Sequence, residues 1–423
     1  MQEEILKAVN ELRQLDPEQR SEALLQFTPH QARVVFEQLE APLQQEMLDW
    51  LPDALVDRLV ADLDPDDRVR LLDTLPESVA NRLLSRLDLR EWRLTHKLLS
   101  YPEESAGRIM TPEYLSLLPS MTAKQAFGLI QRDGKSADTI DALPVLNRDG
   151  HLVGLVMLST LVLAEPEQTV AALMLDQVPT ADPLMDQEEV ARLIQAADLL
   201  ALPVVDEDGR LLGVITVDDA MDIIQLEHEE DFARAGASAP MGRPYFSISL
   251  FGLTRARFVW LLLLAIAGGL TVQVLEAFES LLEQAISLSL FIPLLIGVGG
   301  NSGAQSATTV TRAMALGDVI AGWTAELRVV LREAAVGFLL GTALGLAAYL
   351  PVLLVFDAAL ASTISITLVA ICALATLVGS GMPLLARRAG IDPAVMSAPL
   401  VTTLVDACGL LLYFLIARLI MGL

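Results

Sequence analysis

A single carboxylate stands in the middle of the last apolar run of this chain. Asp406 is the only charged residue between Ala394 and Ala417. Because burying an ionised group in hydrocarbon is costly, an acid at this depth is expected to face a protein-lined, water-filled path or an ion. A neutral Asp406 that is hydrogen-bonded to a neighbouring helix is the structural alternative. This acid points more directly to membrane transport than any other residue of the chain.

An earlier apolar run, from Pro293 to Gln305, is rich in glycine and carries two amides. Glycines at one membrane depth indicate close helix packing, or a kinked helix whose freed carbonyls line a cavity. The amides Asn301 and Gln305 favour a pore wall over packing alone. The pore-lining residues predicted from these two runs are Asn301, Gly299, Gly300, Gln305 and Thr402.

A third candidate for ion binding is a run of seven acids between Asp218 and Asp231. On one helix such acids repel one another unless cations neutralise them. A solvated acidic helix is the more common meaning of a charge run, and the charge pattern alone leaves that alternative open. The run connects the soluble part of the chain to its apolar part, so neutralising its charge could move a pore.

The composition of the chain favours an oxygen-liking ion. Both cysteines, Cys372 and Cys408, lie in apolar runs, and all four histidines lie outside the apolar half. Copper and zinc prefer thiolate or imidazole ligands, so Mg²⁺, Ca²⁺ or Mn²⁺ is favoured. One carboxylate per chain with retained water suits Mg²⁺ better than Ca²⁺, which takes about six to eight oxygen ligands.

The charge is divided unevenly along the chain. Residues 1–244 contain 45 acidic and 21 basic residues, a net charge of −24, whereas the part from Tyr245 onward contains 9 and 8. The acidic half would repel nucleic acid and concentrate cations, so no nucleic-acid partner is expected. The sequence carries no phosphate loop, zinc motif or nucleophile with a base, so an enzyme is the least expected class.

Five apolar runs are long enough to cross a bilayer. They span residues 258–275, 284–311, 334–356, 358–386 and 394–417. Arginines flank alternate ends of the runs, and the positive-inside rule places the N-terminal half in the cytoplasm and the C-terminus outside. The protein is therefore predicted to be integral to the plasma or inner membrane. Since an odd number of helices provides no internal two-fold pairing, a pore on a symmetry axis would need a second subunit.

The first hundred residues are punctuated by prolines spaced 10 to 13 residues apart. Several follow a capping residue, as in Asp16-Pro17 and Asp64-Pro65, which is the signature of a new helix. Short helices at this period predict a superhelical array. Asp62 and Asp66 are four residues apart across a helix start, so they could project to one side, although acids are ordinarily exposed.

An internal repeat follows the array. Residues 143–154 realign 59 positions later as residues 202–213, and each copy indicates a hairpin with an Asp-Gly turn and neighbouring helices. This tandem α/β unit resembles a pair of CBS domains, which commonly bind adenine nucleotides. Thr216 and Asp219 of the second copy are similar to the ribose-binding Thr-x-x-Asp of such domains. The first copy has Met157-Leu158-Ser159-Thr160 there, without the acid.

The order of these parts along the chain, from the helical array through the CBS pair and the acidic helix to the five membrane runs, resembles the MgtE family of magnesium channels and transporters. Its most specific marks are Pro293 to Gln305 and Asp392-Pro393-Ala394 followed by Asp406, together with the junction from Tyr101 to Pro112. The resemblance implies a multi-domain membrane protein. Its parts are a helical superhelical N-domain (1–105), two CBS domains (106–170 and 171–225), an acidic connecting helix (226–254) and an all-α domain of five membrane helices (255–423).

The same resemblance implies a homodimer that imports Mg²⁺ through a pore on its axis, at Asp406 of each subunit. It also implies that cytosolic Mg²⁺ binds between the soluble domains and shuts the pore. ATP is a possible further ligand of the CBS domains. The regulatory metal ligands implied are Asp62, Asp66, Gly107 through its backbone, Glu188, Asp198, Asp219, Asp222, Glu227, Glu230 and Asp231.

Two other functions remain open from the sequence alone. One is exchange of a divalent cation coupled to Na⁺ or H⁺. The other, from a different class, is a nucleotide-sensing membrane scaffold without transport, in which the glycine-rich run only packs. Asp406 argues against the scaffold, because a scaffold needs no acid in the middle of the membrane.

Overall fold

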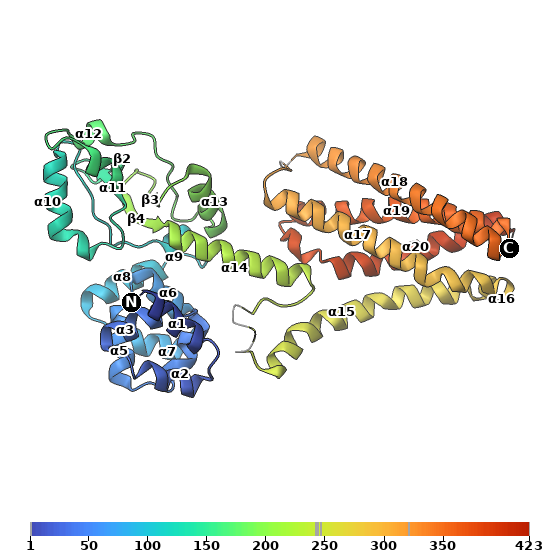
Figure 1. Ribbon diagram of the computed structural model, residues 1–423, viewed down its shortest axis with the longest axis horizontal. Coiled ribbons are helices and arrows are strands. Elements are labelled where there is room, and N and C mark those ends of the chain that lie inside the picture. Colours follow the sequence, from blue (N-terminus) through green and yellow to red (C-terminus); the bar gives the residue numbers. More distant parts are fainter. Residues whose placement is uncertain (1, 242–244, 246–247, 320–321, 423) are drawn as a thin grey trace. The chain divides into compact units, whose positions relative to one another are not determined.

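The computed structural model describes residues 2–241, 245, 248–319 and 322–422. The chain divides into two compact units (Figure 1). The first comprises Met1–His228 and Gly242–Ile248, and the second comprises Glu229–Met241 and Ser249–Leu423. The first unit contains the soluble domains, and the second contains the long apolar helices.

The first unit begins with an array of short helices that share one apolar core (Figure 1). Asp16 caps the second helix by accepting a hydrogen bond from the Gln19 amide, and prolines start several of the others. The helices are α1 (Gln2–Leu12), α2 (Pro17–Leu24), α3 (Pro29–Glu37), α4 (Ala41–Leu48), α5 (Asp53–Asp62), α6 (Pro65–Asp73), α7 (Glu77–Leu84) and α8 (Leu89–Leu99). The predicted array is therefore confirmed.

Buried polar side chains reveal a period of 24 residues in this array. Arg20, Gln44 and Arg68 each donate to the carbonyl eight residues earlier, at 3.0, 2.7 and 2.8 Å. These carbonyls belong to the last turns of α1, α3 and α5, whose backbone acceptors lack partners within the helix. Each copy is thus a helix pair in which a side chain of the second helix holds the end of the first, and the proline spacing marks half of this period.

The CBS pair follows as two antiparallel hairpins with their helices. β1 (Ala142–Leu146) pairs with β2 (Leu152–Met157), and β3 (Ala201–Val205) pairs with β4 (Leu211–Thr216). Both predicted hairpins are confirmed, and both contain an irregularity one residue before the end of the first strand. The accompanying helices are α9 (Ala106–Ile109), α10 (Ala123–Asp133), η1 (Gly134–Ser136), α11 (Leu158–Leu163), α12 (Val170–Leu173) and α13 (Gln187–Ala197).

The two copies exchange their leading segments. Thr111 bridges to Val214 of the second hairpin, and Leu175 bridges to Leu155 of the first. A Cβ on Gly213 would lie 2.6 Å from the Thr111 carbonyl, so only glycine allows this approach. The exchange ties the two copies into one structural body.

The acidic run lies on α14 (Val217–Ala235), one continuous helix that begins directly after β4. In the second unit come α15 (Leu250–Ala277), α16 (Glu279–Gln284), η3 (Ile286–Phe291), α17 (Ile292–Ala315), α18 (Trp323–Val355), α19 (Ala358–Arg388), η4 (Pro393–Val395) and α20 (Ala398–Met421). Within the described ranges, five helices are long and apolar enough to cross a membrane, which agrees with the five predicted runs.

Glycines set the contacts among these long helices. Gly337, Gly341 and Gly345 of α18 form one ridge against the backbone of α19. Gly379 of α19 meets the carbonyl of Gly303 on α17. Such small residues let helix backbones approach in lipid, where no hydrophobic force drives association. These glycine contacts therefore fix how α18 packs against α19 and how α19 packs against α17.

We expect Gly379→Ala to destabilise the helical unit. The new Cβ would overlap the Gly303 carbonyl, and overpacking of this kind costs about 1–3 kcal/mol. Gly381→Ala is the matched control, because no described atom lies within 4 Å of its Cβ position. Size-exclusion profiles after stepwise heating in detergent measure the effect, and equal melting of the two variants would contradict the assignment.

Candidate metal centres

The intramembrane acid predicted from the sequence lies on α20, against the glycine-rich helix. A Cβ built on Gly300 of α17 would be 3.5 Å from Oδ1 of Asp406 and 2.6 Å from the Thr402 methyl group. Asp406 Oδ1 is buried and finds no hydrogen-bond partner among the residues that the structure describes. A buried carboxylate oxygen without a donor is costly, so this atom is suited to a cation or its water.

The other predicted pore residues divide between two faces of α17. Gly299 is buried, with its Cβ position 2.6 Å from Ile371 and 3.2 Å from Val405. Asn301 and Gln305 are exposed on the opposite face of the helix within this chain. The structure therefore brings Gly300 and Thr402 to Asp406, whereas the glycine at 299 packs and the two amides face away from the chain.

Another acid on a candidate membrane-spanning helix was not selected from the sequence. Glu333 of α18 accepts a hydrogen bond of 2.9 Å from the buried Ser306 hydroxyl of α17. Glu333 immediately precedes the apolar run that begins at Ala334, so the sequence placed it at the edge of the membrane. Its hydrogen bond to the glycine-rich helix identifies it as part of the helix packing.

In the soluble unit, three carboxylates from two elements converge (the buried triad). Asp66 and Asp67 lie in the first turn of α6, and Asp219 lies in the first turn of α14. Carboxylate oxygens of all three lie within 4.8 Å of one another. Three hard oxygen ligands at this spacing suit Mg²⁺, which usually keeps several waters as well.

Asp66 is the most informative member of the buried triad. Its side chain is 9% exposed, and its Oδ1 has no hydrogen-bond partner in the described part of the chain. Burial, followed by repulsion from Asp219 and Asp67, raises its pKa well above the ordinary value. Burial likewise raises the pKa of Asp219 to about 6. A cation between these groups would relieve both penalties.

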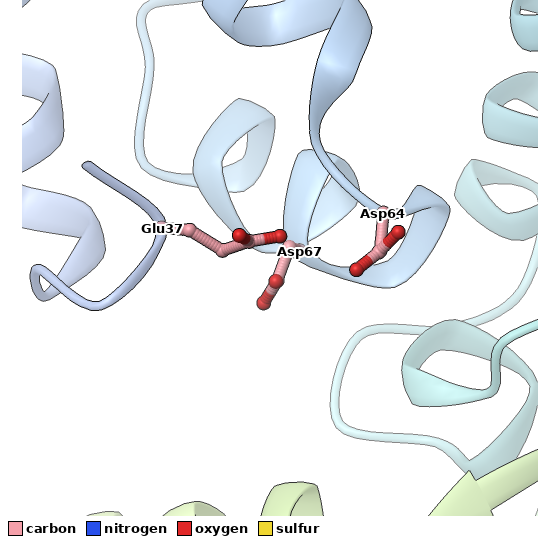
Figure 2. Close-up of side chains that lie close together, drawn as sticks. All are labelled: Glu37, Asp64 and Asp67. Carbon is pink, nitrogen blue, oxygen red and sulfur yellow. The ribbon is translucent and has the colours of Figure 1, made fainter. Parts of the chain in front are cut away.

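A further group, the array triad, lies beside the buried triad. Figure 2 shows Glu37 at the end of α3 directed toward Asp67, with Asp64 at the start of α6. Oxygens of the three carboxylates lie within 4.8 Å of one another, so Asp67 belongs to both triads. Burial raises the pKa of Glu37 to about 7, although Arg33 opposes the shift.

We expect the stability of the soluble unit to depend on pH through these acids. Burial raises the pKa of Asp138 to about 7, as it does for Glu37, whereas unfolded carboxyls titrate near about 4. The folded state therefore binds more protons than the unfolded state, and stability is lost as pH rises from about 4 to about 7. Without Mg²⁺, denaturant unfolding should show higher stability at about pH 6 than at about pH 8.

The control for this experiment is the same pair of measurements in Mg²⁺. A bound cation favours the ionised acids, so the difference between the two pH values should shrink. A protein that gains stability from pH 6 to pH 8 without Mg²⁺ would contradict the burial of these carboxyls.

A cavity of about 260 Å³ adjoins the buried triad. Asp66, Asp219 and Asp222 line it together with Gln187. Gln187 donates a hydrogen bond of 2.7 Å to Glu227, the next predicted ligand along α14. The structure thus brings Asp66, Asp219, Asp222 and Glu227 to one region, three of them from the acidic helix.

Asp62 does not join Asp66, so the two acids do not project to one side within this chain, as their spacing would have allowed. Asp62 ends α5 and is exposed, lining a shallow pocket with His30 and Arg58. Asp66 is buried against α14. The reason is that Leu63 adopts extended backbone between the two helices, so a spacing of four does not place the acids on one helical face.

The remaining predicted ligands of the CBS pair lie apart. Glu188 occupies the first turn of α13 and pairs with Arg192. Asp198 ends the same helix in the left-handed conformation, about 15 Å further along. The Gly107 amide donates to the Pro183 carbonyl at 2.8 Å, beneath the ring of Tyr101. Within this chain, these three positions form no common site with the buried triad.

The end of α14 carries the last two predicted ligands. Arg234 pairs with Glu230 on the same helix and with Asp392, which precedes α20. Asp392 also accepts a hydrogen bond of 2.8 Å from the Ala394 amide and so starts the η4 turn. Asp231 directly follows Glu230 in the sequence. The acid Glu230 is therefore linked, through one guanidinium, to the loop that leads to Asp406.

The predicted nucleotide residues lie at the junction of β4 and α14. The Thr216 hydroxyl donates to Asp219, the acid that also belongs to the buried triad. The same Asp219 carboxylate is therefore predicted both to bind a metal ion and to bind the ribose of a nucleotide.

Asp67, Glu37 and Asp64 were not selected as ligands from the sequence. The 24-residue period provides a signal that could have found two of them. The second-helix start of the first copy reads Asp16-Pro17-Glu18-Gln19, and two copies later the same place reads Asp64-Pro65-Asp66-Asp67. Asp16 caps its helix, whereas Asp64 makes no side-chain cap bond to any described residue.

Comparison with known proteins decides what kind of molecule contains these sites. The family model described as "Divalent cation transporter" matches residues 292–416, that of the "MgtE intracellular N domain" matches residues 4–104, and the CBS domain matches residues 106–167 and 170–226. "Magnesium transporter MgtE" of Thermus thermophilus is 40% identical over 79% of this chain and 74% of its own length. The chain belongs to the MgtE family.

A second MgtE relative agrees with this assignment. The MgtE magnesium transporter of Bacillus subtilis is 36% identical over 84% of this chain and 78% of its own length. The crystal structure of the cytosolic domain of the Mg²⁺ channel MgtE in complex with ATP is 33% identical, covering 52% of this chain and 90% of that chain with a TM-score of 0.49. The MgtE relatives of Thermus thermophilus and Bacillus subtilis are named as magnesium transporters and not as enzymes.

Proposed function

We propose that this MgtE protein carries Mg²⁺ across the membrane into the cell and that cytosolic Mg²⁺, bound to its soluble unit, closes the path. The relatives that are similar over most of the chain are named magnesium transporters. The observation that carries the proposal is the buried Asp406 oxygen, which finds no described hydrogen-bond donor and faces Gly300 of the glycine-rich helix.

The pore is proposed to form in a homodimer. One carboxylate per chain cannot surround an ion, but two symmetry-related Asp406 side chains would hold a hydrated Mg²⁺ weakly enough for it to leave. The amides of Asn301 and Gln305 are exposed in one chain and would line that path, with Gly300 and Thr402 beside the acid. The arginines at alternate ends of the spans support a cytoplasmic N-terminus and an outside C-terminus.

The sensor is proposed to centre on the buried triad. Asp66 has a buried oxygen without a hydrogen-bond partner in the described part of the chain, and Asp219 lies on α14, which precedes the membrane helices in the sequence. Asp67 adds a third ligand, and Asp222 and Glu227 follow on the same helix. Glu230, Asp231, Glu188, Asp198, Asp62 and the Gly107 carbonyl remain proposed regulatory ligands outside the triad.

Adenine nucleotide binding is proposed for the second CBS copy alone. Thr216 and Asp219 stand in the positions of a ribose-binding pair and already share a hydrogen bond. The first copy lacks the acid at the corresponding place.

Flux into liposomes tests the transport proposal. The purified protein should admit Mg²⁺ without a Na⁺ or pH gradient, and Mg²⁺ on the side of the soluble unit should reduce that flux. Ca²⁺ and Mn²⁺ in parallel define selectivity. Mg²⁺ flux that appears only with a Na⁺ or pH gradient would favour the coupled exchanger. If no Mg²⁺ flux appears under any gradient, the transport proposal is overturned.

A further inference from the structure

A basic side chain lies among the acids of the soluble unit. Arg70, in the last turn of α6, pairs with Asp67 on its own helix and, at 3.7 Å, with Asp222 on α14. Arg70 and Asp222 line both the cavity beside the buried triad and a second one of about 340 Å³. Arg70 therefore borders both cavities and lies between the helical array and the acidic helix.

The acids hold this side chain in place. Burial disfavours a charge at Arg70, yet attraction to Asp67, Asp219, Asp222 and Asp66 raises its pKa. Arg68, two residues earlier, is engaged differently, since it donates to the carbonyls of Val60, Ala61 and Leu63 and pairs with Glu91. Arg70 is thus a tethered cation whose partners are the proposed sensor acids themselves.

A divalent cation in the buried triad must share a ligand with Arg70. Asp66 belongs to the triad, and its buried Oδ1 has no hydrogen-bond partner among the described residues, which marks the position for a ligand there. The carboxylate of Asp67 belongs to the triad and also pairs, through its Oδ1, with Arg70. Because two positive charges at one carboxylate repel each other, binding of the ion weakens the Arg70 contact, and the contact weakens binding of the ion.

We propose that Arg70 competes with Mg²⁺ for the sensor acids and so sets the Mg²⁺ concentration at which the soluble unit responds. This inference rests on the sensor part of the proposed function. A guanidinium does not lose its proton in proteins, so the competition persists at every physiological pH. Arg70 would also bridge Asp67 and Asp222 when Mg²⁺ is low, which limits repulsion between α6 and α14.

Limited proteolysis of the full-length protein in detergent, followed along a Mg²⁺ titration, tests the competition. Arg70→Gln removes the charge and keeps a polar side chain, and its half-maximal Mg²⁺ concentration should fall roughly tenfold. Arg70→Lys keeps the charge and should stay within about threefold of the wild type. Arg86→Gln is the control, since Arg86 pairs with Asp53 and Asp57 away from the triads.

The outcomes separate this inference from the sensor proposal. A wild type protected by Mg²⁺ together with an unchanged or raised midpoint in Arg70→Gln overturns the competition alone. A wild type that Mg²⁺ does not protect overturns the sensor and this inference together. Arg70→Met, a second neutral variant that keeps the aliphatic stem, replaces Arg70→Gln if the latter elutes as an aggregate, and the same midpoint shift is expected.

Discussion

Mg²⁺ flux through Asp406→Asn is expected to fall to the leak of protein-free liposomes. The amide has nearly the same shape as the carboxylate, so the packing of α20 against Gly300 and Thr402 is kept. What is lost is the one charge at this depth of α20, and a neutral amide is a poor ligand for a hard cation. The measurement is uptake of Mg²⁺ into liposomes that contain a fluorescent indicator.

Asp357→Asn is the matched control for this variant. Asp357 caps α19 by accepting a hydrogen bond of 2.8 Å from the Leu360 amide, and asparagine caps helices equally well. Its flux should therefore equal that of the wild type. Wild-type flux in Asp406→Asn would remove Asp406 from the transport path, whatever the family of the protein.

The second large effect is expected in the double variant Asp66→Asn, Asp219→Asn, which should conduct Mg²⁺ without inhibition by Mg²⁺ on the side of the soluble unit. Both acids lose their charge at the buried triad, so an ion bound there would lose two of the three carboxylates available to it. The variant is also expected to be more stable without Mg²⁺, since two buried charges that burial disfavours are gone.

Asp149→Asn, Asp208→Asn provides the control for this double variant. Both acids lie in the exposed hairpin turns of the CBS pair, so the change in net charge is the same but falls outside the triads. Its inhibition by Mg²⁺ should match that of the wild type. If the two double variants lose inhibition equally, the soluble unit responds to total charge and not to ions bound at Asp66 and Asp219.

The fold follows closely from the sequence because its main signals are periodic. Long uncharged runs have few alternatives to membrane helices, and an Asp-Gly turn between two apolar strands has few alternatives to a hairpin. The acidic run also lies on one helix, as its pattern indicated. The exchange of Thr111 and Leu175 between the two CBS copies was not predictable, because bridges between distant segments leave no local pattern.

The candidate sites were predicted less completely, and the misses share one cause. Asp66 and Asp219 are 153 positions apart, and their approach depends on how α6 packs beside α14. Asp67 joins the buried triad, and Arg70 pairs with Asp222, only because of that packing. Asp62 was grouped with Asp66 by a helical spacing that fails where Leu63 is extended. The position of Asp406 in its helix, by contrast, needed only the apolar run.

The 24-residue period of the helical array has a consequence for how this unit loses structure. Each copy contacts mainly its neighbours, so stability in such arrays is nearly a sum of local terms, and copies can open one at a time. The C-terminal end of the array is packed against the CBS pair, because Val69 of α6 and Leu98 of α8 share a hydrophobic core with the second CBS copy. Fraying should therefore begin at α1 and stop before α6, so the protein can lose order at its N-terminus while Asp66 and Asp67 stay in place.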